Sequence, residues 1–184
     1  IIINNGTFDF KKNLFQNIIS QCNHLKRNIR FEKDPLKRIK VLSALTLSGI
    51  VFKEYEDNYN IGIKELEKFL KINFDDNGFP LTRNPNDLIS FTKYLILCRE
   101  SINDAQIYIP EFLDDIIKKN LICIEFLKTP CNQVPLFNGG FENDLNSFEK
   151  YLEDLKINKK DRKNTIGGIF FTKSKNQTLY FDVG

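Results

Sequence analysis

Apolar residues recur at the spacing of amphipathic helices along most of the chain. Side chains three or four positions apart lie on one face of an α-helix, so each such stripe predicts a helix with one buried face. The stripes lie within residues 14–29, 36–52, 63–74, 88–98, 113–127 and 145–155. Because the connections between them are short, we expect neighbouring helices to pack as antiparallel hairpins.

Some of these helices carry recognisable start signals. Asp34-Pro35 and Asn84-Pro85 each place a capping side chain before a proline at the first helical position. Asn60 stands shortly before the stripe at 63–74 and is predicted to cap that helix.

The pattern changes after residue 165 to the alternation of β-strands. Leu179, Phe181 and Val183 alternate after a polar turn, and "IGGIFF" precedes that turn, so the segment predicts a β-hairpin. Helices followed by strands favour an α domain joined to a β domain. We therefore predict a helical domain over 1–156, a charged linker over 157–164 and the start of a β domain over 165–184.

Composition sets limits on the class of protein. The 184 residues amount to one domain or slightly more, and 41% apolar residues are enough for a core. The net charge of +3 is a weak basic bias, and the one dense basic run, "KKDRK", is expected to be solvated linker, so no nucleic-acid partner is predicted. No apolar run is long enough to span a membrane. The chain contains no methionine, and we expect it to be a segment of a longer protein.

The cysteines and the histidine do not predict a metal site. Cys22, Cys98, Cys123 and Cys131 show no CxxC spacing, and the sole histidine, His24, has only Cys22 beside it. A disulfide between Cys98 and Cys123 on neighbouring helices remains open. Glycine-rich phosphate loops and a GxSxG motif are absent from the sequence, so no cofactor is predicted.

Two turns hold the candidate binding residues. In "DDNGFPLTRNP", Arg83 lies just before a capped helix, where a fixed guanidinium can hold a carboxylate through two hydrogen bonds. It can equally pair with Asp75, Asp76 or Asp87 and so hold the turn. In "PLFNGG", Asn138 can form a tight turn with positive φ or present its amide to a hydroxyl-rich ligand.

Four segments carry a resemblance to a known family: "ALTLSGIVF" (44–52), "NGFPLTRNPNDL" (77–88), "VPLFNGG" (134–140) and "IGGIFF…TLYFDVG" (166–184). In this order they resemble a buried AL-small-G helix, a "DGGH…R-[NS]-P" turn, an apolar-Phe-Asn/Gly-Gly loop and the opening strands of a C-terminal β-sandwich. These are features of the heparinase II/III-like family of polysaccharide lyases, which includes alginate lyases. Their order and spacing agree with those of the family.

The resemblance implies a mainly α fold. Residues 1–156 would form the C-terminal part of an (α/α) toroid, followed by the first strands of an antiparallel β-sandwich. It also implies an acidic polysaccharide as partner, a carbon–oxygen lyase reaction and a periplasmic or cell-envelope location. In that reaction the carboxylate of a uronic acid is neutralised, a base removes the C5 proton and an acid protonates the leaving O4.

The chain departs from the family at the usual acid and base. Leu36 and Lys37 stand where the family has Asn-His, Pro80 stands where the turn has its His, and Asp87 stands where a Tyr is expected. The catalytic residues are therefore not assigned from the sequence.

The predicted substrate-binding residues are Arg83, Asn84, Lys37 and Asn138. Lys37 is either a cation that neutralises the sugar carboxylate or an exposed helical lysine. Three functions stay open at this point: a lyase, a non-catalytic glycan-binding or structural protein of the cell envelope, and a helical interaction domain.

Overall fold

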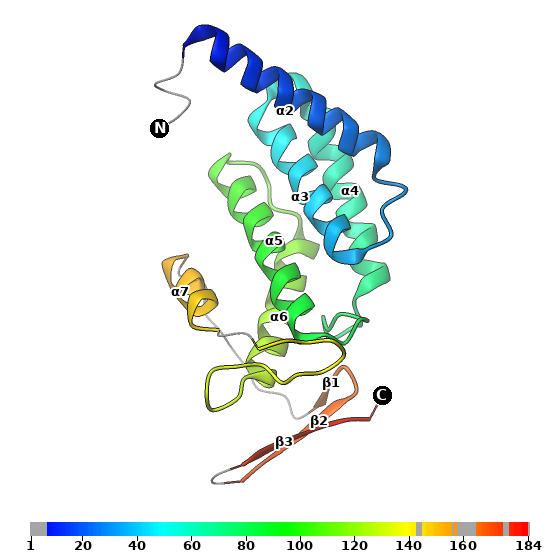
Figure 1. Cartoon of the computed structure of the whole chain (residues 1–184), viewed down its shortest axis with the longest axis vertical. Helices are drawn as coiled ribbons and strands as arrows, with labels where there is room; N and C mark the ends of the chain where they lie inside the picture. The colour runs from blue at the N-terminus through cyan, green and yellow to red at the C-terminus, as the bar shows by residue number, and fades with distance from the viewer. Residues whose placement is uncertain (1–6, 143–144, 156, 158–164, 175–176, 184) are drawn as a thin grey trace. The chain divides into compact units, whose positions relative to one another are not determined.

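The computed structural model describes residues 7–142, 145–155, 157, 165–174 and 177–183 (Figure 1). Its helices are α2 (Phe8–Asn28), α3 (Pro35–Val51), the 3₁₀ helix η1 (Lys53–Tyr55), α4 (Glu56–Asn73), α5 (Pro85–Asp104), α6 (Glu111–Leu127) and α7 (Asn146–Asp154). A small antiparallel sheet follows, with strands β1 (Thr165–Ile166), β2 (Ile169–Lys173) and β3 (Thr178–Asp182). The prediction of a mainly helical chain with antiparallel strands at its end is confirmed. Among the described helices, none is both long and apolar enough to cross a membrane.

The chain divides inside α4 into two compact units, residues 1–66 and 67–184. The predicted linker, 157–164, lies outside the described residues apart from residue 157. The predicted division at that linker therefore stays a prediction, and the two units are described separately below.

In the first unit, α3 and α4 pack closely because each carries a glycine at the contact. A Cβ on Gly49 would lie 2.2 Å from the backbone nitrogen of Tyr59, and a Cβ on Gly62 would lie 2.8 Å from that of Thr46. The contacts pair the end of α3 with the start of α4, so the two helices are antiparallel. This is the hairpin packing that the short connection predicts.

Two of the predicted helix caps are confirmed. Asp34 Oδ1 accepts a hydrogen bond from Leu36 N at 2.9 Å, and Asn84 Oδ1 accepts one from Asn86 N at 2.8 Å. In both helices the proline after the cap occupies the first turn. The side-chain oxygen satisfies a backbone donor that the helix itself cannot satisfy.

The prediction that Asn60 caps the next helix is wrong. The helix α4 already begins at Glu56, directly after η1, so Asn60 lies inside it with an exposed side chain. Glu56 and Asp57 occupy the first turn, where negative charge interacts favourably with the helix dipole. The start of α4 therefore depends on these acidic residues and not on an Asn cap.

In the second unit, α5 and α6 form an antiparallel pair (Figure 1). Near one end Arg99 Nε donates to Asp114 Oδ1 at 2.8 Å, and near the other Thr92 Oγ1 lies 3.2 Å from the amide of Asn120. The positions predicted to face inward on α5 are all buried: Leu88, Phe91, Leu95 and Cys98. Cys98 and Cys123 are not joined in a disulfide, so the pairing that the sequence left open does not form.

The turn between α4 and α5 is closed by its own acidic residue. Asp75 Oδ1 accepts hydrogen bonds from Asn77 N at 2.9 Å and Phe79 N at 2.7 Å, and Asp75 N donates to Phe79 O at 2.9 Å. At its base, Leu81 N donates to Asn73 O at 2.8 Å. Asp75, the first of the two adjacent aspartates in this stretch, thus caps the turn.

This turn is fixed against α6 by a buried amide. The side-chain nitrogen of Asn120 donates to the carbonyls of Gly78 at 2.8 Å and Ile116 at 3.0 Å. Gly78 has a φ of 80°, and a Cβ there would lie 2.5 Å from Lys119 Cβ, so the backbone approaches α6 as closely as only glycine permits.

The sheet contacts the turn between α4 and α5 through the connection that joins β1 to β2. Gly167 and Gly168 join β1 to β2 with φ angles of 57° and 69°, as a two-residue type I′ turn requires. A Cβ on Gly167 would lie 2.2 Å from Phe79 Cδ1, so the glycine turn lies directly on that buried ring.

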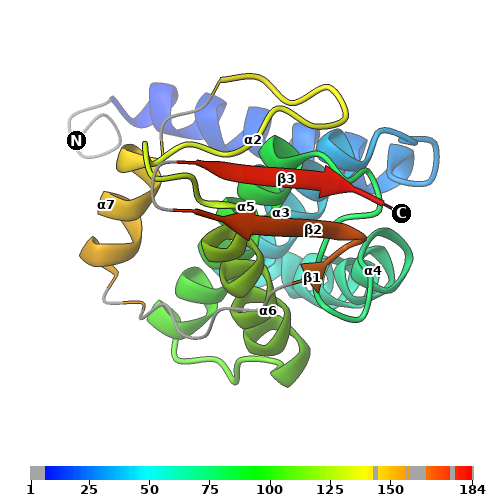
Figure 2. The same ribbon diagram turned by 90° about the horizontal axis from the view of Figure 1, so that it is seen from below.

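The hairpin of β2 and β3 has one packed face and one exposed face (Figure 2). On the packed face the rings of Phe171 and Phe126 are 4.9 Å apart, and the hydroxyl of Tyr180 donates to Leu127 O at 3.0 Å. The exposed face is nevertheless apolar, with Phe170, Leu179 and Phe181 at 45–53% exposure. Three apolar side chains of the hairpin thus remain about half exposed among the described residues.

Alanine substitutions at Asn60 and Asp34 test the two helix starts. Because Asn60 is exposed inside α4, Asn60→Ala should raise helix propensity and stabilise the protein by about 0.5 kcal/mol in urea denaturation. Because Asp34 is a true cap, Asp34→Ala should lower the unfolding free energy by about 1 kcal/mol. A loss of similar size for Asn60→Ala would show that Asn60 caps the helix after all.

Candidate functional site

Three of the four predicted binding residues lie together in the second unit, at the end of β3. The guanidinium of Arg83 donates through Nη2 to Asp182 Oδ1, with which it forms an ion pair, and to Gly168 O at 3.2 Å. Asn138 Nδ2 donates to Arg83 O at 3.2 Å and to Asp182 Oδ2 at 3.3 Å. Asn84 follows Arg83 directly and caps α5. We call Arg83, Asn84, Asn138 and Asp182 the Arg83 cluster.

Backbone conformation at the cluster is unusual for residues other than glycine. Arg83 has a φ of 56° and Asn138 a φ of 49°, both in the left-handed region. Such residues cost on the order of 1–3 kcal/mol each and persist where the surroundings fix them. The tight turn predicted at Asn138-Gly139 is confirmed, with Gly140 N donating to Phe137 O at 2.8 Å.

A second amide contact holds the loop of Asn138 over the start of α5. Asn86 is buried, and its Oδ1 accepts a hydrogen bond from Phe141 N at 2.9 Å. The loop is therefore attached on both sides of its turn, through Asn138 to Arg83 and through Asn86 to Phe141. This arrangement keeps the Asn138 amide within reach of Asp182.

The carboxylate beside Arg83 was not identified from the sequence. The pattern suggested Asp75, Asp76 or Asp87 as structural partners, all close in the chain, whereas Asp182 lies 99 positions away. The side chains of Arg83 and Asp182 are 22% and 31% exposed, so the ion pair is only partly shielded from water. The sequence did contain one relevant feature, because Asp182 is the single Asp in the predicted last strand. The hairpin register pairs it with Ile169.

The fourth predicted binding residue, Lys37, lies in the first unit. It occupies the first turn of α3, its backbone nitrogen donates to Asp34 Oδ1 at 3.3 Å, and its side chain is exposed.

Three positions differ from the acid–base residues of the heparinase II/III-like pattern, and the side chains there do not form an acid–base pair. Pro80 is buried and pairs with Phe74 in an isolated β-bridge. Asp87 is half-buried in the first turn of α5. Leu36 is half-buried in α3, in the other unit.

Tyr180 is the tyrosine nearest in sequence to the cluster, but its environment suits a structural role. Burial raises the pKa of its hydroxyl above the ordinary value of 10.0, and the hydroxyl donates to Leu127 O. A general base works best when its pKa lies near the operating pH, so this shift acts against proton abstraction by Tyr180. Burial also raises the pKa of Tyr59 and of Tyr151.

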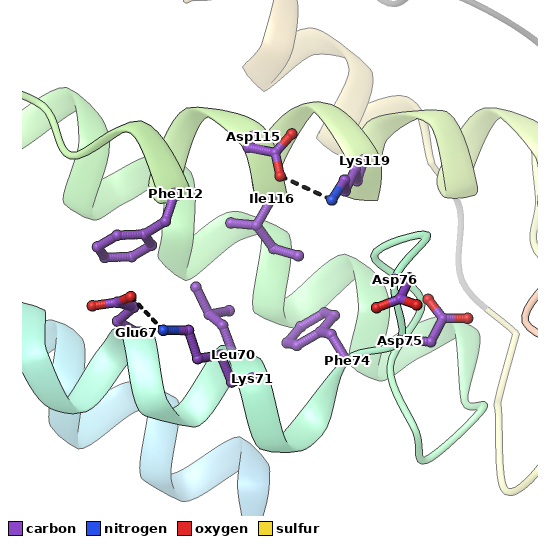
Figure 3. Close-up of a pocket in the computed structure, with 10 residues that line it drawn as sticks. All are labelled: Glu67, Leu70, Lys71, Phe74, Asp75, Asp76, Phe112, Asp115, Ile116 and Lys119. Carbon is purple, nitrogen blue, oxygen red and sulfur yellow. Dashed lines mark hydrogen bonds and ion pairs between the residues drawn. The ribbon is translucent and has the colours of Figure 1, made fainter.

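A pocket of about 260 Å³ lies elsewhere in the second unit, between the end of α4, the turn and α6 (Figure 3). It is lined by Glu67, Leu70, Lys71, Phe74, Asp75, Asp76, Phe112, Asp115, Ile116 and Lys119. None of the predicted binding residues lines it. Within the described parts of the chain, no group of three or more His, Cys, Asp or Glu side chains is arranged to hold a metal ion.

Comparisons with models of protein families, with curated proteins and with solved structures gave no match.

A double-mutant cycle tests the ion pair of Arg83 and Asp182. Because both side chains are partly buried and charged, we expect a coupling energy of about 1–2 kcal/mol from Arg83→Ala, Asp182→Ala and the double variant, measured by urea denaturation. The exposed pair Lys71–Glu67, with 72% and 42% exposed side chains, is the control and should couple by at most about 0.5 kcal/mol. Equal coupling in the two cycles would contradict a special role for the Arg83 pair.

The raised pKa of Tyr180 predicts a specific pH dependence. Since the folded protein holds this proton more tightly than the unfolded chain, the stabilisation is complete below pH 10.0 and is lost as the pH rises through the folded pKa. Tyr180→Phe should therefore flatten the decline of the urea midpoint between about pH 9 and about pH 11. The same decline in the Tyr180→Phe variant would show that other groups cause it.

Proposed function

We propose that this chain is part of a heparinase II/III-like polysaccharide lyase that cleaves a uronic-acid glycan by β-elimination. The observation that carries the proposal is the convergence of the segments that resemble the family. Arg83 and Asn84 come from the segment 77–88, Asn138 from 134–140 and Asp182 from the last strand, and their side chains and backbones meet at one place. Segments that meet around one polar cluster favour a shared function over a chance resemblance of short motifs.

The fold part of the proposal is an (α/α) toroid followed by an antiparallel β-sandwich. Antiparallel helix pairs, α3 with α4 and α5 with α6, are the units of which such toroids consist. The exposed apolar face of the hairpin, formed by Phe170, Leu179 and Phe181, is what the second layer of a sandwich would bury. Both features support the proposed architecture.

The chemistry requires a fixed positive charge near the sugar carboxylate. Removal of the C5 proton places negative charge on the carboxylate, and a guanidinium held in position stabilises that charge without reorganising. Arg83 is held in position by Asp182 and Gly168, so in this proposal the sugar carboxylate competes with Asp182 for the guanidinium. The amides of Asn84 and Asn138 are the groups we assign to sugar hydroxyls.

The acid and base of the reaction are not assigned to residues of this chain. The positions that match the family's acid–base residues are Leu36, Lys37, Pro80 and Asp87. Leucine and proline side chains carry no proton that can be transferred, and Lys37 and Asp87 do not restore the family's His and Tyr. We therefore propose that groups outside this chain segment, or groups not matched to the family, transfer the protons. A periplasmic or cell-envelope location belongs to the same proposal.

A non-catalytic glycan-binding or structural role in the cell envelope is the second candidate. It is favoured by one specific observation, the engagement of both Asp182 oxygens, one by Arg83 and the other by Asn138. An arginine in such an ion pair serves the packing of turn, loop and strand without any ligand. The loss of the family's usual acid and base points the same way.

Incubation with a panel of uronic-acid polysaccharides tests the lyase proposal. We expect the protein that contains this chain to raise the ultraviolet absorbance of the unsaturated product with at least one polymer. Arg83→Ala should lower kcat/KM by about 100-fold or more, since it removes a charge that acts on the developing anion. Arg30→Ala, which removes an exposed arginine of the first unit, is the control and should leave the rate unchanged.

Because Arg83→Ala also breaks an ion pair, Asp182→Asn separates stability from function. It weakens the same contact but keeps the guanidinium, so it should retain activity if Arg83 binds the substrate. Glycan binding without product on any polymer would support the non-catalytic role instead. The absence of both glycan binding and product would overturn both candidates.

A further inference from the structure

The pocket between α4 and α6 has an apolar centre that is open to a ligand (Figure 3). Leu70 and Phe74 of the α4 side face Ile116 and Phe112 of α6 across it. Its volume of about 260 Å³ lies just below the range of about 300–1,000 Å³ that is usual for drug-sized ligands. The pocket therefore fits a small molecule with a short apolar body.

The charged side chains around this centre have an excess of carboxylates. Each lysine is paired on its own helix, Lys71 with Glu67 at 2.6 Å and Lys119 with Asp115 at 2.9 Å (Figure 3). The two pairs neutralise the long sides of the pocket. The negative charge that remains is at one end, where the turn begins.

Asp75 and Asp76 form that end. Asp75 uses Oδ1 to accept from two backbone nitrogens of the turn. Asp76 is exposed, and no cation of the described residues forms an ion pair with it. The two adjacent carboxylates thus place negative charge at this end of the pocket, and no ion pair of the described residues compensates it.

The negative end is also fixed in position. The bonds of Asp75 close the turn, and the amide of Asn120 holds Gly78 of that turn against α6. A carboxylate on a fixed turn needs little reordering when a ligand binds, which favours affinity.

We propose that this pocket is a binding site for a small alkylammonium ligand. The apolar chain of the ligand lies between α4 and α6, from the ring of Phe112 toward Phe74, and its ammonium group contacts Asp76 at the turn. An anionic ligand of the same shape is repelled by Asp75 and Asp76. The pocket is therefore separate from any site for an acidic polysaccharide, and the proposal is independent of the lyase function.

Three probes with the same six-carbon body test the ligand chemistry. Hexylammonium, hexanol and hexanoate are each titrated into the full chain, and binding is followed by protein NMR. We expect hexylammonium to shift resonances of α4, the turn and α6, and to bind more tightly than hexanol, whereas hexanoate does not bind. Binding of hexylammonium should weaken as salt is added, because salt screens the carboxylates.

Two variants locate the site and one controls for general charge effects. Asp76→Asn should weaken hexylammonium binding by about two- to fivefold, the effect of one exposed charge pair. Phe112→Ala should weaken hexylammonium and hexanol alike, because it removes apolar contact area from both. Asp104→Asn, which removes an exposed carboxylate outside the pocket at the end of α5, should leave binding unchanged.

The outcomes decide the proposal. Equal binding of hexanoate and hexylammonium, or no binding of hexylammonium, would overturn it. An equal loss for Asp76→Asn and Asp104→Asn would show nonspecific attraction to a carboxylate surface and would overturn it as well. The exposed positions of Asp76 and Asp104 keep the fold of both variants intact, which circular dichroism checks.

Discussion

Three residues of the turn between α4 and α5 each contact a different part of the second unit. Gly78 lies against α6 and accepts a hydrogen bond from the buried Asn120, Phe79 lies under the glycine turn of the sheet, and Arg83 pairs with Asp182 at the end of β3. The bonds of Asp75 close this turn from within. The helix pair and the hairpin therefore share one attachment point, and both the Arg83 cluster and the acidic end of the pocket depend on it.

Local signals in the sequence identified most of the elements, because those elements depend on neighbouring residues. The caps at Asp34 and Asn84 and the hairpin after residue 165 follow from side chains within a few positions of the structure that they form. Asn60 shows the limit of this approach. An Asn before an apolar stripe is a common cap, but at α4 the acidic first turn and the preceding η1 start the helix one turn earlier.

The candidate site was predictable in part for the same reason. Asn138 lies in an Asn-Gly turn whose residue types predicted a positive φ, and the structure confirms it. Arg83 was singled out for its position before a capped helix, and its own positive φ was not predicted. Asp182 could not be found in this way, because its pairing with Arg83 depends on tertiary packing of the hairpin and not on a local pattern. The unit boundary inside α4 was equally invisible, since the helical stripe runs through it without interruption.

The ion pair of Arg83 and Asp182 also bears on how the chain folds. It joins residues 99 positions apart, and closing a flexible loop of that length costs about 4 kcal/mol of chain entropy. The antiparallel pair of α5 and α6 joins residues as few as 15 positions apart, so it closes a much shorter loop. The helix pair can therefore form first and present the ring of Phe79 as a surface on which the strands assemble. In such an order the hairpin gains its stability only on docking, and we expect it to open before the helix pair of α5 and α6 does.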